Sequence, residues 1–111
     1  MNIKLLQAGM LSAILLAHGV SIAGGDAAKG QELSVTCAAC HGADGNSSIP
    51  TNPILAGQYE SYLVQALNDY KSGARNNAIM AGFAAALSQQ DIKDLAAYFS
   101  SQESALYVPD R

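Results

Sequence analysis

Two cysteines and a histidine stand together in the segment TCAACHG, and their side chains are the ones best suited to chemistry. Cys37 and Cys40 are the two cysteines of the 111-residue chain, and His41 follows the second directly. On a helix these residues occupy positions i, i+3 and i+4, so they project from one face. Two thiols and an imidazole on one face can bind a metal, exchange a disulfide or attach a cofactor.

Four interpretations of this cluster compete. A zinc site needs about four ligands, and this segment offers three. A thiol–disulfide oxidoreductase places its cysteines near a βαβ unit, and the chain has no convincing strand candidates. Two buried cysteines with a hydrogen-bonded histidine would leave their adjacency unexplained. The pattern C-x-x-C-H is typical of c-type haem attachment, in which each thiol adds across a haem vinyl group and the histidine binds the iron. We favour this fourth interpretation.

The first 23 residues have the pattern of an export signal. Lys4 supplies a short positive region, residues 5–20 are mostly apolar, and small residues precede position 24. An uncleaved membrane anchor is the alternative, but polar Gln7 and His18 interrupt a run that is already short for a spanning helix. The pattern predicts a signal peptide over 1–23 and a mature domain over 24–111 that is periplasmic and has no membrane span.

Composition points to one small domain that needs support from a bound group. Half of the residues are hydrophobic, yet the chain has no tryptophan, and so short a chain buries little apolar surface. A covalently bound haem would fill the centre. Without Lys4, the six basic residues become five against nine acidic ones, a net charge of −4. This balance argues against nucleic acid as a partner.

A haem bound through His41 needs a group at its sixth iron position. Met1 and Met10 lie in the predicted leader, so Met80 is the thioether that the mature domain retains. Met80 is far enough from His41 along the chain to reach the opposite haem face. Gly82 beside it lacks a side chain and would allow close backbone approach. We therefore expect His41 and Met80 to be the two metal ligands.

Hydrophobic periodicity predicts a helix that ends near Lys71 and Gly73. The positions of its apolar face are Tyr59, Tyr62, Leu63, Ala66, Leu67 and Tyr70. A last helix is predicted from Ser88, with Asp91 as a capping-box partner, through Phe99.

A first helix is expected to begin near Asp26, a good N-cap residue. The segment 42–57 is rich in Gly, Asn, Ser and Pro, which predicts an ordered loop around the cofactor. These elements together predict an all-α protein.

The chain resembles a class I cytochrome c, and particularly one half of the tandem two-haem periplasmic cytochromes c. The resemblance covers nearly all of residues 24–107 and rests on GDAAKGQELSVTCAACHGADGN, PILAGQYESYLVQALNDYKSGAR and IMAGFAAALSQQDIKDLAAYFSSQ, in that order. It implies three to five helices wrapped around one covalently bound haem, with the N- and C-terminal helices crossing. The positions that match this crossing are Gly30, Leu95 and Tyr98.

The resemblance also implies site residues. The Pro53 carbonyl is expected to bind the second nitrogen of the histidine ligand and fix its ring. Gln58, Tyr62 and Arg75 lie in segments that could reach the haem propionates. The chain departs from many class I cytochromes at Ser34, where they carry an aromatic residue, and its single C-x-x-C-H allows one haem rather than two.

The implied function is electron transfer by haem c, not catalysis. The expected partners are redox proteins: a donor dehydrogenase or cytochrome complex, and an acceptor oxidase or reductase. One alternative is a cytochrome subunit of an exported dehydrogenase, such as a sulfide-oxidising flavoprotein. Another is a ligand-binding haem protein with an open iron position, against which the presence of Met80 argues.

Overall fold

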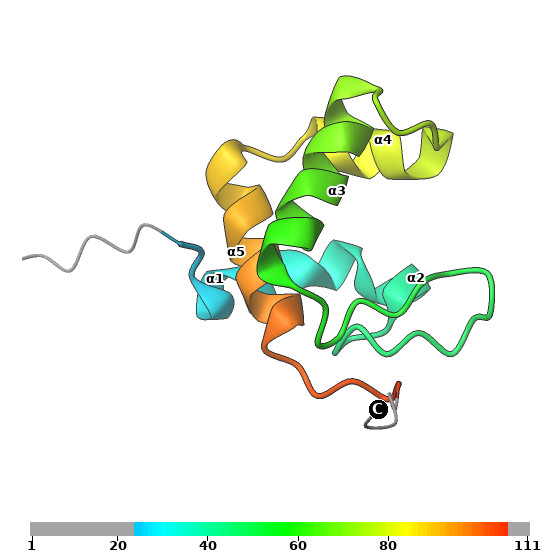
Figure 1. The fold of residues 1–111 in the computed structure, drawn as a ribbon, viewed down its shortest axis with the longest axis vertical. Coiled ribbons are helices and arrows are strands. Elements are labelled where there is room, and N and C mark those ends of the chain that lie inside the picture. The colour runs from blue at the N-terminus through cyan, green and yellow to red at the C-terminus, as the bar shows by residue number, and fades with distance from the viewer. Residues whose placement is uncertain (1–23, 107–111) are drawn as a thin grey trace, which may run out of the picture.

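The computed structural model describes residues 24–106, and all of its regular elements there are helical (Figure 1). In chain order they are α1 (Ala27–Leu33), the 3-10 turn η1 (Ser34–Thr36), α2 (Ala38–His41), α3 (Glu60–Ser72), α4 (Ala78–Ala85) and α5 (Gln89–Ser100). The predicted leader 1–23 lies outside the described residues. Within the described range, no helix has the length and apolar character needed to cross a bilayer.

The helix ends follow the capping signals in the sequence. The Asp26 carboxylate accepts hydrogen bonds from the first amides of α1. At the start of α5, Ser88 and Asp91 form a complete capping box in which each side chain bonds the other residue's backbone amide. Gly73, in the left-handed conformation with φ of 83°, ends α3. The predicted bounds of the second and last helices are thus confirmed to within one or two residues.

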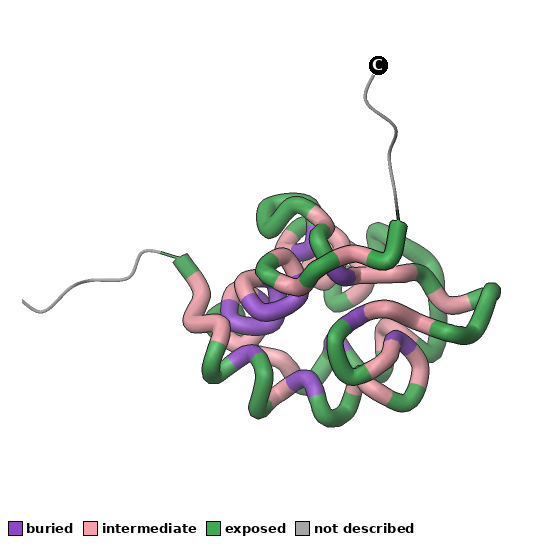
Figure 2. Tube along the Cα trace, turned by 90° about the horizontal axis from the view of Figure 1, so that it is seen from below, coloured by how far each residue is buried: buried purple, intermediate pink, exposed green. Residues whose placement is uncertain are grey.

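The core lies where α1 crosses α5, and Gly30 makes this crossing possible. A Cβ at Gly30 would lie 1.9 Å from the Asp94 backbone oxygen and 2.7 Å from the Tyr98 Cβ. Leu95 and Tyr98 are buried beside it in the main hydrophobic cluster. The expected crossing at these positions is confirmed, and the buried residues in Figure 2 gather along this contact.

Ser34 occupies its unusual position without leaving a buried polar group unpaired. The residue is buried, and its hydroxyl donates a hydrogen bond of 2.8 Å to the Gln31 carbonyl. The helical run therefore turns through η1 into α2 without an aromatic side chain at this position.

The loop 42–57 folds back on the core as an ordered segment. The Gly45 carbonyl accepts hydrogen bonds from the Leu55 and Ala56 amides at 2.8 and 3.2 Å. The Gly57 amide donates to the Phe99 carbonyl at 3.0 Å, which ties the loop to α5. This loop runs beside α2, as the teal and green trace of Figure 1 shows, and it places the Pro53 carbonyl within hydrogen-bond distance of His41.

Candidate haem-binding site

The cysteine and histidine side chains meet at the short helix α2. Cys37 is the N-cap of α2 and Cys40 and His41 form its last turn, closed by a 3.0 Å hydrogen bond from the His41 amide to the Cys37 carbonyl. Both cysteines are half-buried and neither forms a disulfide. Burial raises the pKa of the Cys37 thiol, opposed in part by a hydrogen bond with Thr36.

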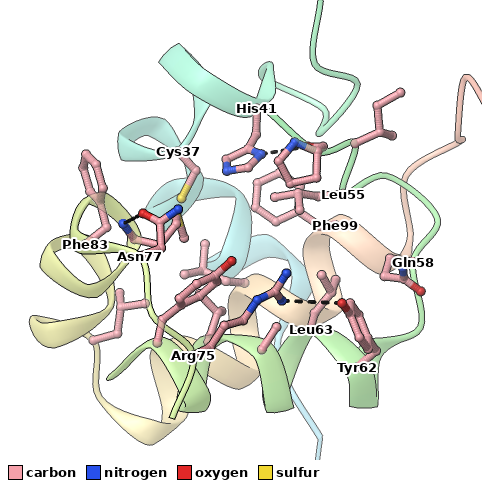
Figure 3. A pocket seen from close by; sticks show the side chains of 18 of the residues that line it. Cys37, His41, Leu55, Gln58, Tyr62, Leu63, Arg75, Asn77, Phe83 and Phe99 are labelled. Carbon is pink, nitrogen blue, oxygen red and sulfur yellow. Dashed lines mark hydrogen bonds between the residues drawn. The ribbon is translucent and has the colours of Figure 1, made fainter. Parts of the chain in front are cut away.

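The His41 ring is fixed by the backbone. Its Nδ1 lies 2.8 Å from the Pro53 carbonyl oxygen, and the residue is buried (Figure 3). Because a carbonyl oxygen can only accept, Nδ1 carries the hydrogen and donates it. The lone pair of Nε2 is then free to bind a metal. The hydrogen bond expected between His41 and Pro53 is present.

Two polar side chains that the sequence analysis did not single out fasten α2 to the loop. Ser47 Oγ and Asn52 Nδ2 each donate a 3.0 Å hydrogen bond to the Cys40 carbonyl, one of the unpaired carbonyls at the end of α2. Tyr98 Oη donates to the Ala43 carbonyl at 2.8 Å and joins the same loop to α5. Little in the sequence indicates the roles of Ser47 and Asn52, because serine and asparagine in a loop usually serve turns.

A cavity of about 220 Å³ opens between α2, α3 and α4. Its walls are mainly apolar, and they include Ile54, Leu55, Leu63, Ala66, Leu67, Leu87, Leu95 and Phe99. Cys37, His41 and Met80 all line it. A smaller adjoining cavity shares these three residues and reaches Cys40. A flat apolar cofactor held by two sulfurs at one edge therefore fits the residues that the fold brings together.

Met80 lines the cavity from α4, whereas His41 lines it from α2. Figure 1 shows these two helices apart from one another. Met80 is half-buried, and its amide donates a 3.0 Å hydrogen bond to Asn77 Oδ1, the N-cap of α4. Neither α4 nor this cap was predicted from the sequence, although an asparagine before an apolar run is a known helix-start signal. Gly82 has no protein atom within 4 Å of an added Cβ, so no described segment of the chain approaches its backbone closely.

The three residues predicted to meet the propionates all line the cavity. Arg75 Nη1 lies 3.5 Å from Tyr62 Oη, and its guanidinium carbon lies 4.8 Å from the centre of the Tyr70 ring (Figure 3). Gln58 Oε1 accepts a 2.9 Å hydrogen bond from the Tyr59 amide, which leaves the Gln58 NH₂ group as a donor. Tyr59 itself is 80% exposed and precedes α3, so its predicted place on the apolar face was wrong.

The comparisons with known proteins agree with this geometry. A sequence profile described as Cytochrome c matches residues 27–103. Cytochrome c4 of Pseudomonas aeruginosa is 49% identical over 83% of this chain and 46% of its own length. Cytochrome c-554(548) of Halomonas halodenitrificans is 48% identical over 71% of this chain and 99% of its own length. This chain thus spans about half the length of the c4 relatives.

A solved structure gives the same result for the fold. Reduced recombinant cytochrome c4 from Pseudomonas stutzeri superposes with a TM-score of 0.71 at 45% identity, covering 78% of this chain and 50% of that one. The expected likeness to one half of a tandem cytochrome is thereby confirmed. The chain belongs to the cytochrome c family, and its cofactor is the family's haem c, bound covalently through Cys37 and Cys40.

Proposed function

We propose that this protein is an exported, periplasmic one-electron carrier whose haem iron is bound by His41 and Met80. The observation that carries the proposal is the apolar cavity, which an imidazole and a thioether enter from different helices. Haem supplies the one-electron change of its iron between the ferrous and ferric states. The predicted leader supports export.

The residues of this chain set how that change occurs. The Pro53 carbonyl holds the His41 ring in one orientation, and α4 presents the soft sulfur of Met80. A thioether favours the ferrous state, and apolar walls disfavour the additional charge of the ferric one. Two ligands that stay bound leave no open position for a substrate, so the site suits electron transfer better than catalysis.

The surface around the two cysteines that bind the haem suits contact with redox partners. Residues 33–43, 45–59 and 76–90 contain no lysine, arginine, aspartate or glutamate. Ile79 and Phe83 line the cavity that reaches Cys40 and are respectively 68% and 47% exposed. Electron exchange with a donor dehydrogenase or cytochrome complex, and with an acceptor oxidase or reductase, would take place through this uncharged rim. Its rate should then change little with salt.

A second candidate is a permanent cytochrome subunit of an exported dehydrogenase. It is favoured by the relative named the cytochrome subunit of sulfide dehydrogenase of Chlorobaculum tepidum, 38% identical over 66% of each chain. Stable copurification with a dehydrogenase from the native cells would support this function. Isolation of the cytochrome alone at physiological salt would favour the shuttle.

The deciding experiment is expression of the full chain in cells that attach haem c. Denaturing mass analysis should show one covalent haem, and replacing both Cys37 and Cys40 with alanine should remove it. The native spectrum should show sulfur bound to iron, and Met80→His should lower the reduction potential. A bare polypeptide, or rapid carbon monoxide binding to the reduced wild type, would contradict the proposal.

A further inference from the structure

The helix that carries Met80 has little apolar packing of its own. Of the eight residues of α4, only Ala84 is buried, while Ile79 and Phe83 are largely exposed. The helix packs on α3, as the yellow and green ribbons of Figure 1 show. Ile79, Met80 and Phe83 line the two cavities, where a bound group would cover them, so the contacts of α4 with the rest of the chain lie along α3 and at the helix ends.

Lys71, in the last turn of α3, contacts the end of α4 through hydrogen bonds. Its Nζ donates to the Ala85 carbonyl at 3.3 Å and also to the Leu87 carbonyl. The last carbonyls of a helix lack partners within the helix and carry partial negative charge. An ammonium group satisfies both needs, because it is a cation with three donors.

The turn between α4 and α5, called here the α4–α5 corner, is joined to α3 by a second hydrogen bond between neutral side chains. Gln89 Nε2 donates a 2.9 Å hydrogen bond to Asn68 Oδ1, one turn before Lys71. Lys71 also lies near enough to Asp91 to help lower the pKa of that carboxyl, after the larger effect of the Ser88 hydrogen bonds. Leu87, whose carbonyl accepts a hydrogen bond from Lys71, precedes Gln89 by two residues and lines the cavity. The α4–α5 corner is thus fastened to α3 by one charged and one neutral contact.

We propose that Lys71 is a positioning residue for the methionine ligand. By holding the C-terminal end of α4 on α3, it limits how far Met80 can move away from the iron and so sets how long the sulfur stays bound. Asn77 holds the N-terminal end of the same helix. This inference rests on the proposed ligation by Met80.

Mutations can distinguish the contribution of the apolar carbons of the Lys71 side chain from that of its ammonium group. Lys71→Met keeps a long apolar side chain but removes all three donors and the charge. Lys71→Arg keeps the charge and can still donate to two carbonyls. Lys29→Met is the matched control, because Lys29 pairs with Glu32 on the solvent-facing side of α1 and lines neither cavity.

The test uses the ferric holoprotein and measures how fast added imidazole displaces the sulfur ligand, with Met80 dissociation as the limiting step. Lys71→Met should speed displacement by about three- to tenfold, the range expected for losing a charge-assisted contact at a helix end. Lys71→Arg should lie close to wild type, and Lys29→Met should equal it. A Lys71→Met rate no faster than that of Lys29→Met would overturn the inference.

Hydrogen exchange supplies a readout that does not depend on displacement chemistry. Lys71→Met should speed amide exchange in residues 78–85 while leaving residues 92–99 of α5 unchanged. Equal acceleration in both helices would indicate general destabilisation and would overturn a positioning role, as would no acceleration in either. If the wild-type spectrum shows no iron–sulfur bond, the proposed ligation has itself failed, whatever the variants do.

Discussion

The two sides of the cavity are held in different ways. On the histidine side, His41, the Cys40 carbonyl and the Ala43 carbonyl each bond to a residue elsewhere in the fold. On the methionine side, α4 has one buried residue and is anchored mainly through α3. Histidine placement is therefore built into the core, whereas methionine placement depends on a few contacts at helix ends.

The largest expected effect on stability comes from replacing a glycine by alanine on each side of the cavity and comparing the two variants. Gly30→Ala should destabilise the holoprotein by about 3 kcal/mol or more, because its Cβ would overlap backbone atoms of α5. Gly82→Ala should be neutral or stabilising by up to about 1 kcal/mol, because it adds a better helix former in open space. Denaturant unfolding followed by circular dichroism measures both. Similar losses in the two variants would remove the contrast between the sides.

A smaller loss is expected from the hydroxyl that joins the histidine loop to α5. Tyr98→Phe should cost about 1–1.5 kcal/mol, because the hydrogen bond from the buried Tyr98 side chain to the Ala43 carbonyl is lost. Tyr59→Phe is the control, since Tyr59 is 80% exposed, and should leave the unfolding midpoint unchanged. An unchanged midpoint for Tyr98→Phe as well would show that this link does not support the histidine side.

The two donors on the Cys40 carbonyl should behave as a coupled pair. Ser47→Ala or Asn52→Ala alone should cost about 0.5–1.5 kcal/mol, because the other donor still satisfies the carbonyl. The double variant should lose more than the sum of the single losses, because the carbonyl is then left without either side-chain donor. Additive losses in a double-mutant cycle on the holoprotein would indicate two unrelated contacts.

The smallest effect is a pH dependence shared by both sides. Hydrogen bonds from Asn46 lower the pKa of Asp44 on the histidine loop, and hydrogen bonds from Ser88 lower the pKa of Asp91 at the α4–α5 corner. A lowered folded-state pKa contributes stability above the unfolded-state pKa, and this stability is lost as pH falls through the folded-state value.

Asp44 is exposed and Asp91 is half-buried. Each carboxylate accepts its hydrogen bonds from a residue two or three positions away, so the loss below about pH 4 should be slight. Thermal unfolding of Asp44→Asn and Asp91→Asn should each show a flatter decline with acid than wild type. A steeper decline in either variant would mean that its carboxylate does not stabilise the folded state.

Sequence patterns predicted the parts of the molecule that local rules control. The C-x-x-C-H spacing, the Ser88–Asp91 box and the glycine after α3 each state a local geometry, and each was found. The fold class followed from them together with the family resemblance. Gly30 required that resemblance, because a lone glycine in a helical segment does not itself indicate what crosses it.

The contacts that sequence reasoning missed are tertiary. Helix α4 is an alanine-rich stretch whose few large side chains face a cavity or solvent, so it lacks the periodicity that marks a helix packed on a core. Ser47, Asn52 and Lys71 act on backbone carbonyls of other segments. No residue-type pattern identifies a carbonyl as the partner, so these roles become visible only in three dimensions.

The hydrogen bond between His41 and Pro53 also limits how the imidazole ring can move. His41 is buried, and turning its ring would take Nδ1 away from the Pro53 carbonyl in a place that solvent reaches poorly. We expect that an iron held by Nε2 would change oxidation state with little movement of its histidine. The energy of structural rearrangement that accompanies each electron exchange would then be small.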